Sequence, residues 1–150
     1  MNVSKFSLAN SAIYRINLRG YEIRPMKLQK MIYYTVGFYY QRYRDLIVED
    51  RFVRWPYGPV YPIIFRYFGN YNGDPIESYY YLDDKYSIIN RRKYEFYDIL
   101  DRVIDFYIDY TDKELEKIVN KHMCIRKTKK NHYIDWDLFK TTFDGLGYGE

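Results

Sequence analysis

The chain has 150 residues and a formal net charge of +4; 47% of the residues are hydrophobic and 29% are charged. This length suits one domain with a core of its own and is short for two, and the hydrophobic content excludes a disordered chain. The longest apolar run, residues 31–40, is shorter than the ~20 residues of a membrane-spanning helix. We therefore expect a single folded domain over residues 1–150, with no membrane segment.

Two helices are predicted in the first third of the chain. Residues 7–18 place apolar side chains at helical spacing, and Gly20 follows as a C-terminal stop. A second helix is predicted at about 25–44, beginning at Pro25, whose missing N–H is not needed at the first helical position. Helical spacing gives this helix two apolar stripes, whereas a surface helix needs only one. The first stripe comprises Leu28, Met31, Ile32, Thr35 and Tyr39, and the second comprises Gln29, Tyr33, Gly37 and Tyr40.

The middle of the chain favours a small β-hairpin at about 46–55, because β-favouring runs there flank a polar tip. The following segment, WPYGPVYP at 55–62, contains three prolines and is expected to be a rigid turn rather than a strand. A helix should then run from about residue 59 to residue 69. A turn is predicted at 72–75, and residues 79–82 are compatible with either a strand or an extended loop.

A long helix is predicted at about 92–110, with apolar side chains on one face and an acidic stripe on the other. Thr111 and Glu114 have the spacing of a capping box, which predicts a short helix that ends near Asn120. Asp135 is expected to cap a last helix, and three glycines indicate a loose tail from about residue 144. The acidic stripe consists of Asp98, Asp101, Asp105 and Asp109.

The sequence carries few groups suited to catalysis. Two histidines and one cysteine do not suffice for a structural zinc site, and His122 and Cys124 lie two positions apart, where helical side chains point in different directions. Neither GxGxxG nor GxxxxGK[ST] occurs, so a nucleotide site has no support. We therefore predict no catalytic residue, no cofactor and no metal. A single cysteine also excludes an internal disulfide, which favours a cytoplasmic location.

Basic residues gather at 42–44, 91–94 and 121–130, and the first two segments also contain tyrosine. Such patches can neutralise a phosphate backbone, so nucleic-acid binding is one alternative function. The 20 acidic residues spread through the chain oppose it. The 21 tyrosines would suit protein interfaces, although an A/T-rich genome produces the same bias.

Several motifs occur in order along residues 8–143: Ala9-Asn10, Pro25, Lys27-Leu28-Gln29-Lys30, Tyr33-Tyr34, Gly37-Phe38-Tyr39, and then Trp55 with Tyr57-Gly58-Pro59-Val60. Leu115, His122 and residues 134–143 follow more loosely. This order and spacing resembles the Panacea domain, a family that includes SocA-type antitoxins and GepA-like phage-associated proteins. Arg24 departs from the Ser or Thr that usually precedes the proline of the second helix, and it cannot cap that helix. The tryptophan common after the family's histidine is also absent.

The resemblance implies a mainly α (α+β) fold, a compact helical domain around the central helix at about 25–44 with a small β element. It also implies a non-enzymatic antitoxin that neutralises one partner toxin by direct binding and, in some members, brings it to a protease. Members are frequent in bacterial phages and mobile elements. In such a fold the second stripe of the central helix is mostly internal core, because Gly37 lets another element approach.

The motif residues divide into those that shape the fold and those that are candidate contacts with the protein partner. A further alternative is a phage-encoded anti-defence inhibitor of the anti-CRISPR type, whose acidic stripe would imitate a nucleic-acid backbone and bind a nuclease. Residues expected to shape the fold are Pro25, Leu28, Gln29, Tyr33, Gly37, Gly58, Pro59 and Val60. The candidate partner contacts are Trp55, Tyr57, Lys27, Lys30, His122 and the acidic stripe of Asp98, Asp101, Asp105 and Asp109.

Overall fold

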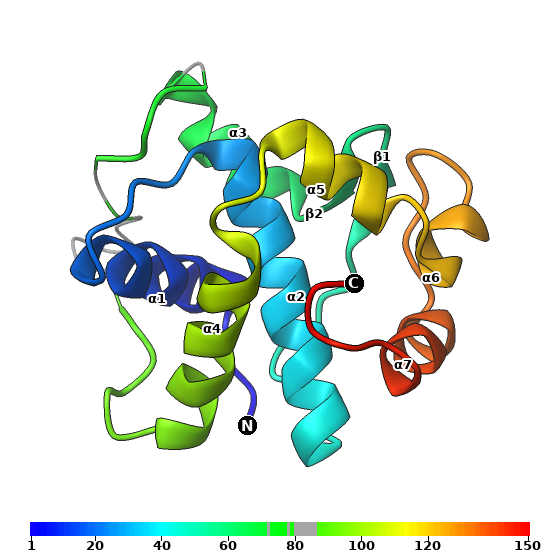
Figure 1. Ribbon diagram of the computed structural model, residues 1–150, viewed down its shortest axis with the longest axis horizontal. Helices are drawn as coiled ribbons and strands as arrows, with labels where there is room; N and C mark the ends of the chain where they lie inside the picture. The colour runs from blue at the N-terminus through cyan, green and yellow to red at the C-terminus, as the bar shows by residue number, and fades with distance from the viewer. Residues whose placement is uncertain (72, 78, 80–86) are drawn as a thin grey trace.

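The computed structural model describes residues 1–71, 73–77, 79 and 87–150, and it is mainly helical with one small hairpin (Figure 1). The expected fold class is confirmed. The turn predicted at 72–75 and the segment 79–82 lie partly outside the described residues. In chain order the elements are α1 (Lys5–Leu18), α2 (Pro25–Tyr43), β1 (Val53–Trp55), β2 (Gly58–Val60), α3 (Pro62–Phe68), the short 3-10 helix η1 (Gly69–Tyr71), α4 (Tyr94–Tyr107), α5 (Asp112–Val119), α6 (Met123–Arg126) and α7 (Trp136–Asp144).

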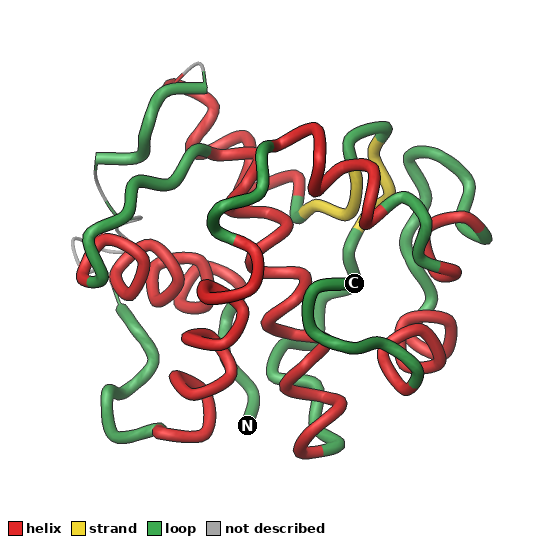
Figure 2. The backbone as a smooth tube through the Cα atoms, in the orientation of Figure 1, coloured by secondary structure: helices red, strands yellow, loops and turns green. Residues whose placement is uncertain are grey.

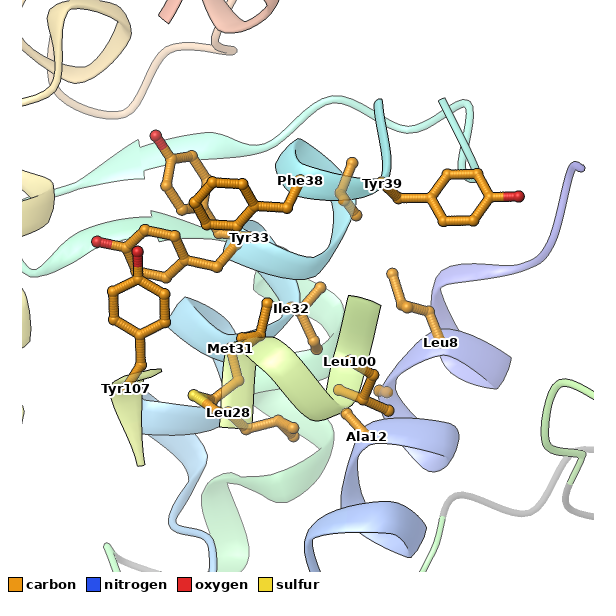
Figure 3. Packing of buried hydrophobic residues seen from close by; sticks show 14 of the residues in the cluster. Leu8, Ala12, Leu28, Met31, Ile32, Tyr33, Phe38, Tyr39, Leu100 and Tyr107 are labelled. Carbon is orange, nitrogen blue, oxygen red and sulfur yellow. The ribbon is translucent and has the colours of Figure 1, made fainter. Parts of the chain in front are cut away.

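The helix α2 forms the centre of the molecule and contacts α1, α3, α4, α5, α7 and β2. Every residue from 28 to 39 is buried. Figure 1 shows α2 running through the middle, with α1 and α4 on one side and α7 on the other. In Figure 3, Tyr33 and Phe38 leave α2 on one side and Tyr39 leaves it on another. The helix therefore has two apolar stripes because it has neighbours on opposite sides.

The second stripe of α2 packs against α7. The ring of Phe143 lies over Gly37, and a Cβ atom built on Gly37 would be only 2.1 Å from Phe143 Cζ. Tyr33 packs edge-on against Phe143 and Phe139, with ring centroids 5.2 Å and 5.6 Å away. The missing side chain at position 37 thus lets α7 approach the central helix. Gln29, Tyr33 and Gly37 are all buried, as expected for an internal stripe.

Local capping sets several helix starts. The predicted capping box is present at α5: the backbone N–H of Thr111 donates to Glu114 Oε1 at 3.0 Å, and the N–H of Glu114 donates to Thr111 Oγ1 at 3.1 Å. Asp135 accepts a backbone N–H at the start of α7, also as predicted. The helix α1 begins slightly earlier than expected because Ser4 caps it. Arg24 gives α2 no side-chain cap.

The hairpin lies later in the chain than predicted. Its strands pair antiparallel with Trp55 opposite Gly58, whereas residues 46–52 form no regular strand. The Pro- and Gly-rich segment that argued against a strand is the hairpin turn itself: Pro56 lies in the turn, and Gly58 takes a φ of +125°, which side-chain-bearing residues rarely adopt. The following helix α3 consequently begins at Pro62 rather than near residue 59.

The C-terminal residues contact the core and do not form the loose tail that their glycines predicted. The backbone oxygen of Glu150 accepts a hydrogen bond from Tyr34 Oη at 3.0 Å. The N–H of Gly149 donates to Tyr107 Oη at 2.8 Å. The segment therefore runs back across α2 and gives buried tyrosine hydroxyls the partners they need (Figure 1).

Gly37→Ala is expected to lower the free energy of unfolding by about 1–3 kcal/mol, because the added methyl group must displace the Phe143 ring within a packed core. The matched control is Gly69→Ala, since Gly69 has a helical φ of −61° and open space around its Cα. Alanine is favoured over glycine in an open helical site by up to about 1 kcal/mol, so this control should keep or gain stability. Urea denaturation measures both variants. Equal midpoints would show that α7 does not pack on Gly37.

Candidate partner-binding site

The turn of the hairpin projects at the edge of the helical body, beside α5 (Figure 1 and Figure 2). Tyr57 at its tip is 56% exposed. The three residues of β2 behind it are buried. The positive φ of Gly58 fixes the direction of the turn, because only glycine adopts this conformation at low cost. The sequence therefore places a large aromatic side chain in solvent on a backbone with little freedom.

Two neighbouring elements hold this turn in place. The ring of Trp55 packs edge-on against Phe65 of α3, with centroids 5.3 Å apart. On the other side, Asn120 Nδ2 at the end of α5 donates to the backbone oxygen of Pro56 at 3.5 Å. Trp55, Phe65 and Asn120 are each half-buried, so they border the exposed tip. We name this region the hairpin surface, made up of Trp55, Pro56, Tyr57, Phe65 and Asn120.

Two hollows lie at the start of α2, and only the smaller one borders the hairpin surface, through Phe65. The smaller has a volume of about 270 Å³ and is lined by apolar groups that include Phe65 and Met26. The larger has a volume of about 560 Å³ and is lined mainly by charged side chains, among them Lys27. Arg24 and Asp112 line both hollows and separate them. The smaller hollow is thus an apolar recess with Arg24 and Asp112 at its rim, an arrangement that is typical of recognition surfaces.

The two lysines of the KLQK motif have different surroundings. Lys27 Nζ donates to the backbone oxygens of Tyr110, at 2.6 Å, and of Ile108, so it satisfies carbonyl groups just beyond α4. Lys30 is only 2% exposed and lies beneath the hairpin. Burial lowers the pKa of both lysines, while Asp112 partly offsets this by favouring the charged forms. Of the two predicted contact residues, Lys27 has a structural role and Lys30 is almost covered.

The sequence alone suggested that the acidic stripe is a row of free carboxylates. The structure shows instead that two of its members are paired with arginines. Asp101 accepts two hydrogen bonds from Arg15 of α1, at 2.8 Å from Nε and 2.7 Å from Nη2. Asp105 forms an ion pair with Arg19, which also contacts Asp101. The hydrogen bond to Asp101 raises the pKa of Arg15, and the one to Asp105 raises that of Arg19. Half of the stripe therefore joins α4 to α1.

The remaining two members of the stripe, Asp98 and Asp109, are exposed. Asp98 lies in the first half of α4, and Asp109 lies just beyond its end, eleven positions later. Two carboxylates this far apart do not make the continuous acidic face that imitation of a nucleic acid would need.

His122 belongs to the core rather than to the surface, which corrects its prediction as a candidate contact. It is 6% exposed, its Nδ1 accepts from Tyr33 Oη at 2.8 Å, and its Nε2 lies 3.2 Å from the backbone oxygen of Glu150. These contacts fit the neutral tautomer with the proton on Nε2. Burial lowers the pKa of His122. Cys124 is fully buried, 3.3 Å from the same Tyr33 hydroxyl, and its pKa is raised by burial.

Phe65 and Asn120 are the members of the hairpin surface that the sequence did not indicate. Phe65 belonged to a run of apolar residues in a predicted helix, and its contact with Trp55 depends on where the hairpin lies. Asn120 marked only the end of a short helix. Within the described residues, no group of three His, Cys, Asp or Glu side chains is placed to hold a metal ion.

The fold and the hairpin surface define a small helical domain that presents a fixed aromatic turn beside an apolar recess. A family model described as "Antitoxin SocA-like, Panacea domain" matches residues 28–124. The chain therefore belongs to the SocA-like antitoxin family of Panacea domains, and the match runs from the first turn of α2 to the start of α6 and includes the whole hairpin. No curated protein and no solved structure matches the chain. In the described part of the chain, no helix has the length and apolar character to cross a membrane.

The buried His122 predicts a specific pH dependence. Its pKa is lowered in the folded protein, so near its ordinary value of 6.5 the unfolded chain binds the proton more readily. Stability should therefore be complete above about pH 6.5 and fall as the pH decreases through the lowered pKa. Melting temperatures between pH 7.5 and 5.5 measure this loss, which His122→Gln should remove. His132→Gln is the control, since His132 is exposed, and it should keep the pH dependence of the parent. If His132→Gln lost the pH dependence and His122→Gln kept it, His122 would not be its source.

Proposed function

We propose that the protein is an antitoxin without enzymatic activity that neutralises one partner toxin by direct binding through the hairpin surface. The observation that carries the proposal is the exposed Tyr57, held at the tip of a turn within a chain that belongs to the SocA-like antitoxin family. Family membership supports an antitoxin-type role and a protein partner. The hairpin surface is where we place the contact.

The physical properties of the turn suit this role. Large aromatic side chains dominate binding energy at protein interfaces, and a backbone that is already ordered loses little entropy on association. Tyr57 offers such a ring, and contacts from α3 and α5 hold the turn on both sides. The recess of about 270 Å³ beside Phe65 is large enough to receive one apolar side chain of the toxin. Delivery of the toxin to a protease, which the resemblance implies for some members, would follow the same contact.

The two alternatives have less support from the arrangement of charges. An anti-defence inhibitor that imitates a nucleic acid would use the acidic stripe, but Asp101 and Asp105 are already paired with arginines of α1. A nucleic-acid-binding module would use the basic residues at 42–44. Arg44 there pairs with Asp144 and lies over the ring of Tyr40. We therefore place neither alternative ahead of toxin binding.

The genetic test is co-expression with the toxin encoded beside the gene. The toxin alone should arrest growth, and co-expression should relieve the arrest through a complex that can be purified. A toxin whose activity persists beside the folded protein would contradict the proposal.

Tyr57→Ala should weaken toxin binding by about 1–3 kcal/mol, because it removes an aromatic anchor, and should leave the melting temperature nearly unchanged. Isothermal titration calorimetry and thermal denaturation measure the two quantities. Tyr94→Ala is the matched control, since Tyr94 is 70% exposed and opens α4, outside the hairpin surface. The control should bind as tightly as the parent. A Tyr57→Ala protein that melts far below the parent yet keeps its affinity would assign the turn to folding alone.

A further inference from the structure

Lys30 lies beneath the hairpin surface and is the one lysine of the motif without a visible structural role. Its side chain extends from α2 to the hairpin, where a Cβ atom built on Gly58 would be 3.7 Å from Lys30 Cε and 3.8 Å from Val119 Cγ1 of α5. The side chain is therefore enclosed by three elements, and the residue is 2% exposed. A lysine this deeply covered is rare unless its charge is paired.

The ammonium group of Lys30 has no such pairing. Within the described part of the chain, no hydrogen-bond acceptor or carboxylate lies in bonding distance of its Nζ. Asp112 and Glu116 of α5 influence its pKa only at longer range. Lys27, one turn earlier on the same helix, has two carbonyl acceptors. Lys27 is thus paired and Lys30 is not, and this difference needs an explanation.

Besides Lys30 Nζ, a second polar atom between the hairpin and α5 lacks a hydrogen-bond partner. Asn120 Oδ1 is enclosed there without a donor, although Nδ2 of the same residue donates to Pro56. The Lys30 ammonium, by contrast, is not fully enclosed, so it keeps a narrow contact with the surface. Its surroundings lie directly below the turn that carries Tyr57. Lys30 and Tyr57 therefore belong to the same part of the molecule.

An unpaired ammonium in this position costs stability in the free protein, since burial removes most of its contact with water and no group of the chain compensates for that loss. An apolar side chain of similar length would fit the same space without that cost. In a complex the situation reverses, because a carboxylate placed on the ammonium forms a charge-assisted hydrogen bond in a region from which water is excluded. The ammonium has three donors and no acceptor, so an anionic oxygen is its best partner.

We infer that Lys30 is a recognition residue that receives an aspartate or glutamate side chain of the bound toxin. The inference rests on the proposed function and adds the chemistry of the partner: an acidic residue beside the group that contacts Tyr57. The carboxylate bonds to Lys30 Nζ. Tyr57 supplies apolar contact, and Lys30 supplies selection for negative charge.

The test compares Lys30→Met with Lys27→Met, two identical substitutions one helical turn apart. Lys30→Met should leave the free energy of unfolding unchanged or raise it, because it removes an unpaired buried ammonium. The same variant should bind the purified toxin at least about 30-fold more weakly, as expected when one partner of a buried charge pair is lost. Lys27→Met should do the opposite: it should unfold more easily and, where folded, bind as the parent does.

The outcomes separate this inference from the proposed function. Failure of the parent protein to bind the toxin would overturn both. If the parent binds and Lys30→Met binds equally well, only the role of Lys30 is overturned. Destabilisation by Lys30→Met that Glu116→Gln reproduces would also overturn it, because Lys30 would then pair within its own chain. Toxin variants with single Asp→Asn or Glu→Gln changes complete the test: one of them should lose affinity for the parent but not for Lys30→Met.

Discussion

Burial of α2 on all sides is the constraint on which the rest of the structure depends. A helix covered from residue 28 to residue 39 needs neighbours on opposite faces, and the far face is available to α7 only because Gly37 has no side chain. Because α2 is almost wholly covered, most of the contact with a partner has to come from elements at the edge. The hairpin, α3 and the end of α5 are such elements, and the turn of the hairpin carries the exposed Tyr57.

The same packing explains how a tyrosine-rich core is tolerated. Tyr33, Tyr34 and Tyr107 are fully buried, and each hydroxyl has a partner: His122 for Tyr33, and backbone groups of the C-terminal segment for the other two. Burial raises the pKa of all three, so they stay neutral hydrogen-bonding groups. His122 therefore organises the interior, and the partner surface has to draw its polar selectivity from elsewhere. We propose Lys30 for that role.

Features decided by local sequence could be predicted, and features decided by distant contacts could not. The capping box at Thr111 and Glu114 and the cap at Asp135 follow from neighbouring residues alone. The close approach of another element to Gly37 could also be predicted, once the family resemblance had indicated the fold. The hairpin was predicted too early in the chain because the prolines at 56 and 59 were taken to exclude a strand. Its position depends instead on the positive φ of Gly58, which the sequence does not reveal. The acidic stripe was misread because its arginine partners come from α1, more than 80 positions away.

The central claim is that the toxin covers the hairpin surface, and hydroxyl-radical footprinting of the free protein and of its toxin complex tests it most directly. Oxidation reports the exposure of individual aromatic side chains, and Tyr57, Tyr94 and Phe106 are all at least half exposed in the free protein. The complex should protect Tyr57 and leave Tyr94 and Phe106 oxidised as before. Protection of Phe106, beside the acidic stripe, with Tyr57 still fully oxidised would contradict the claim and place the partner on α4.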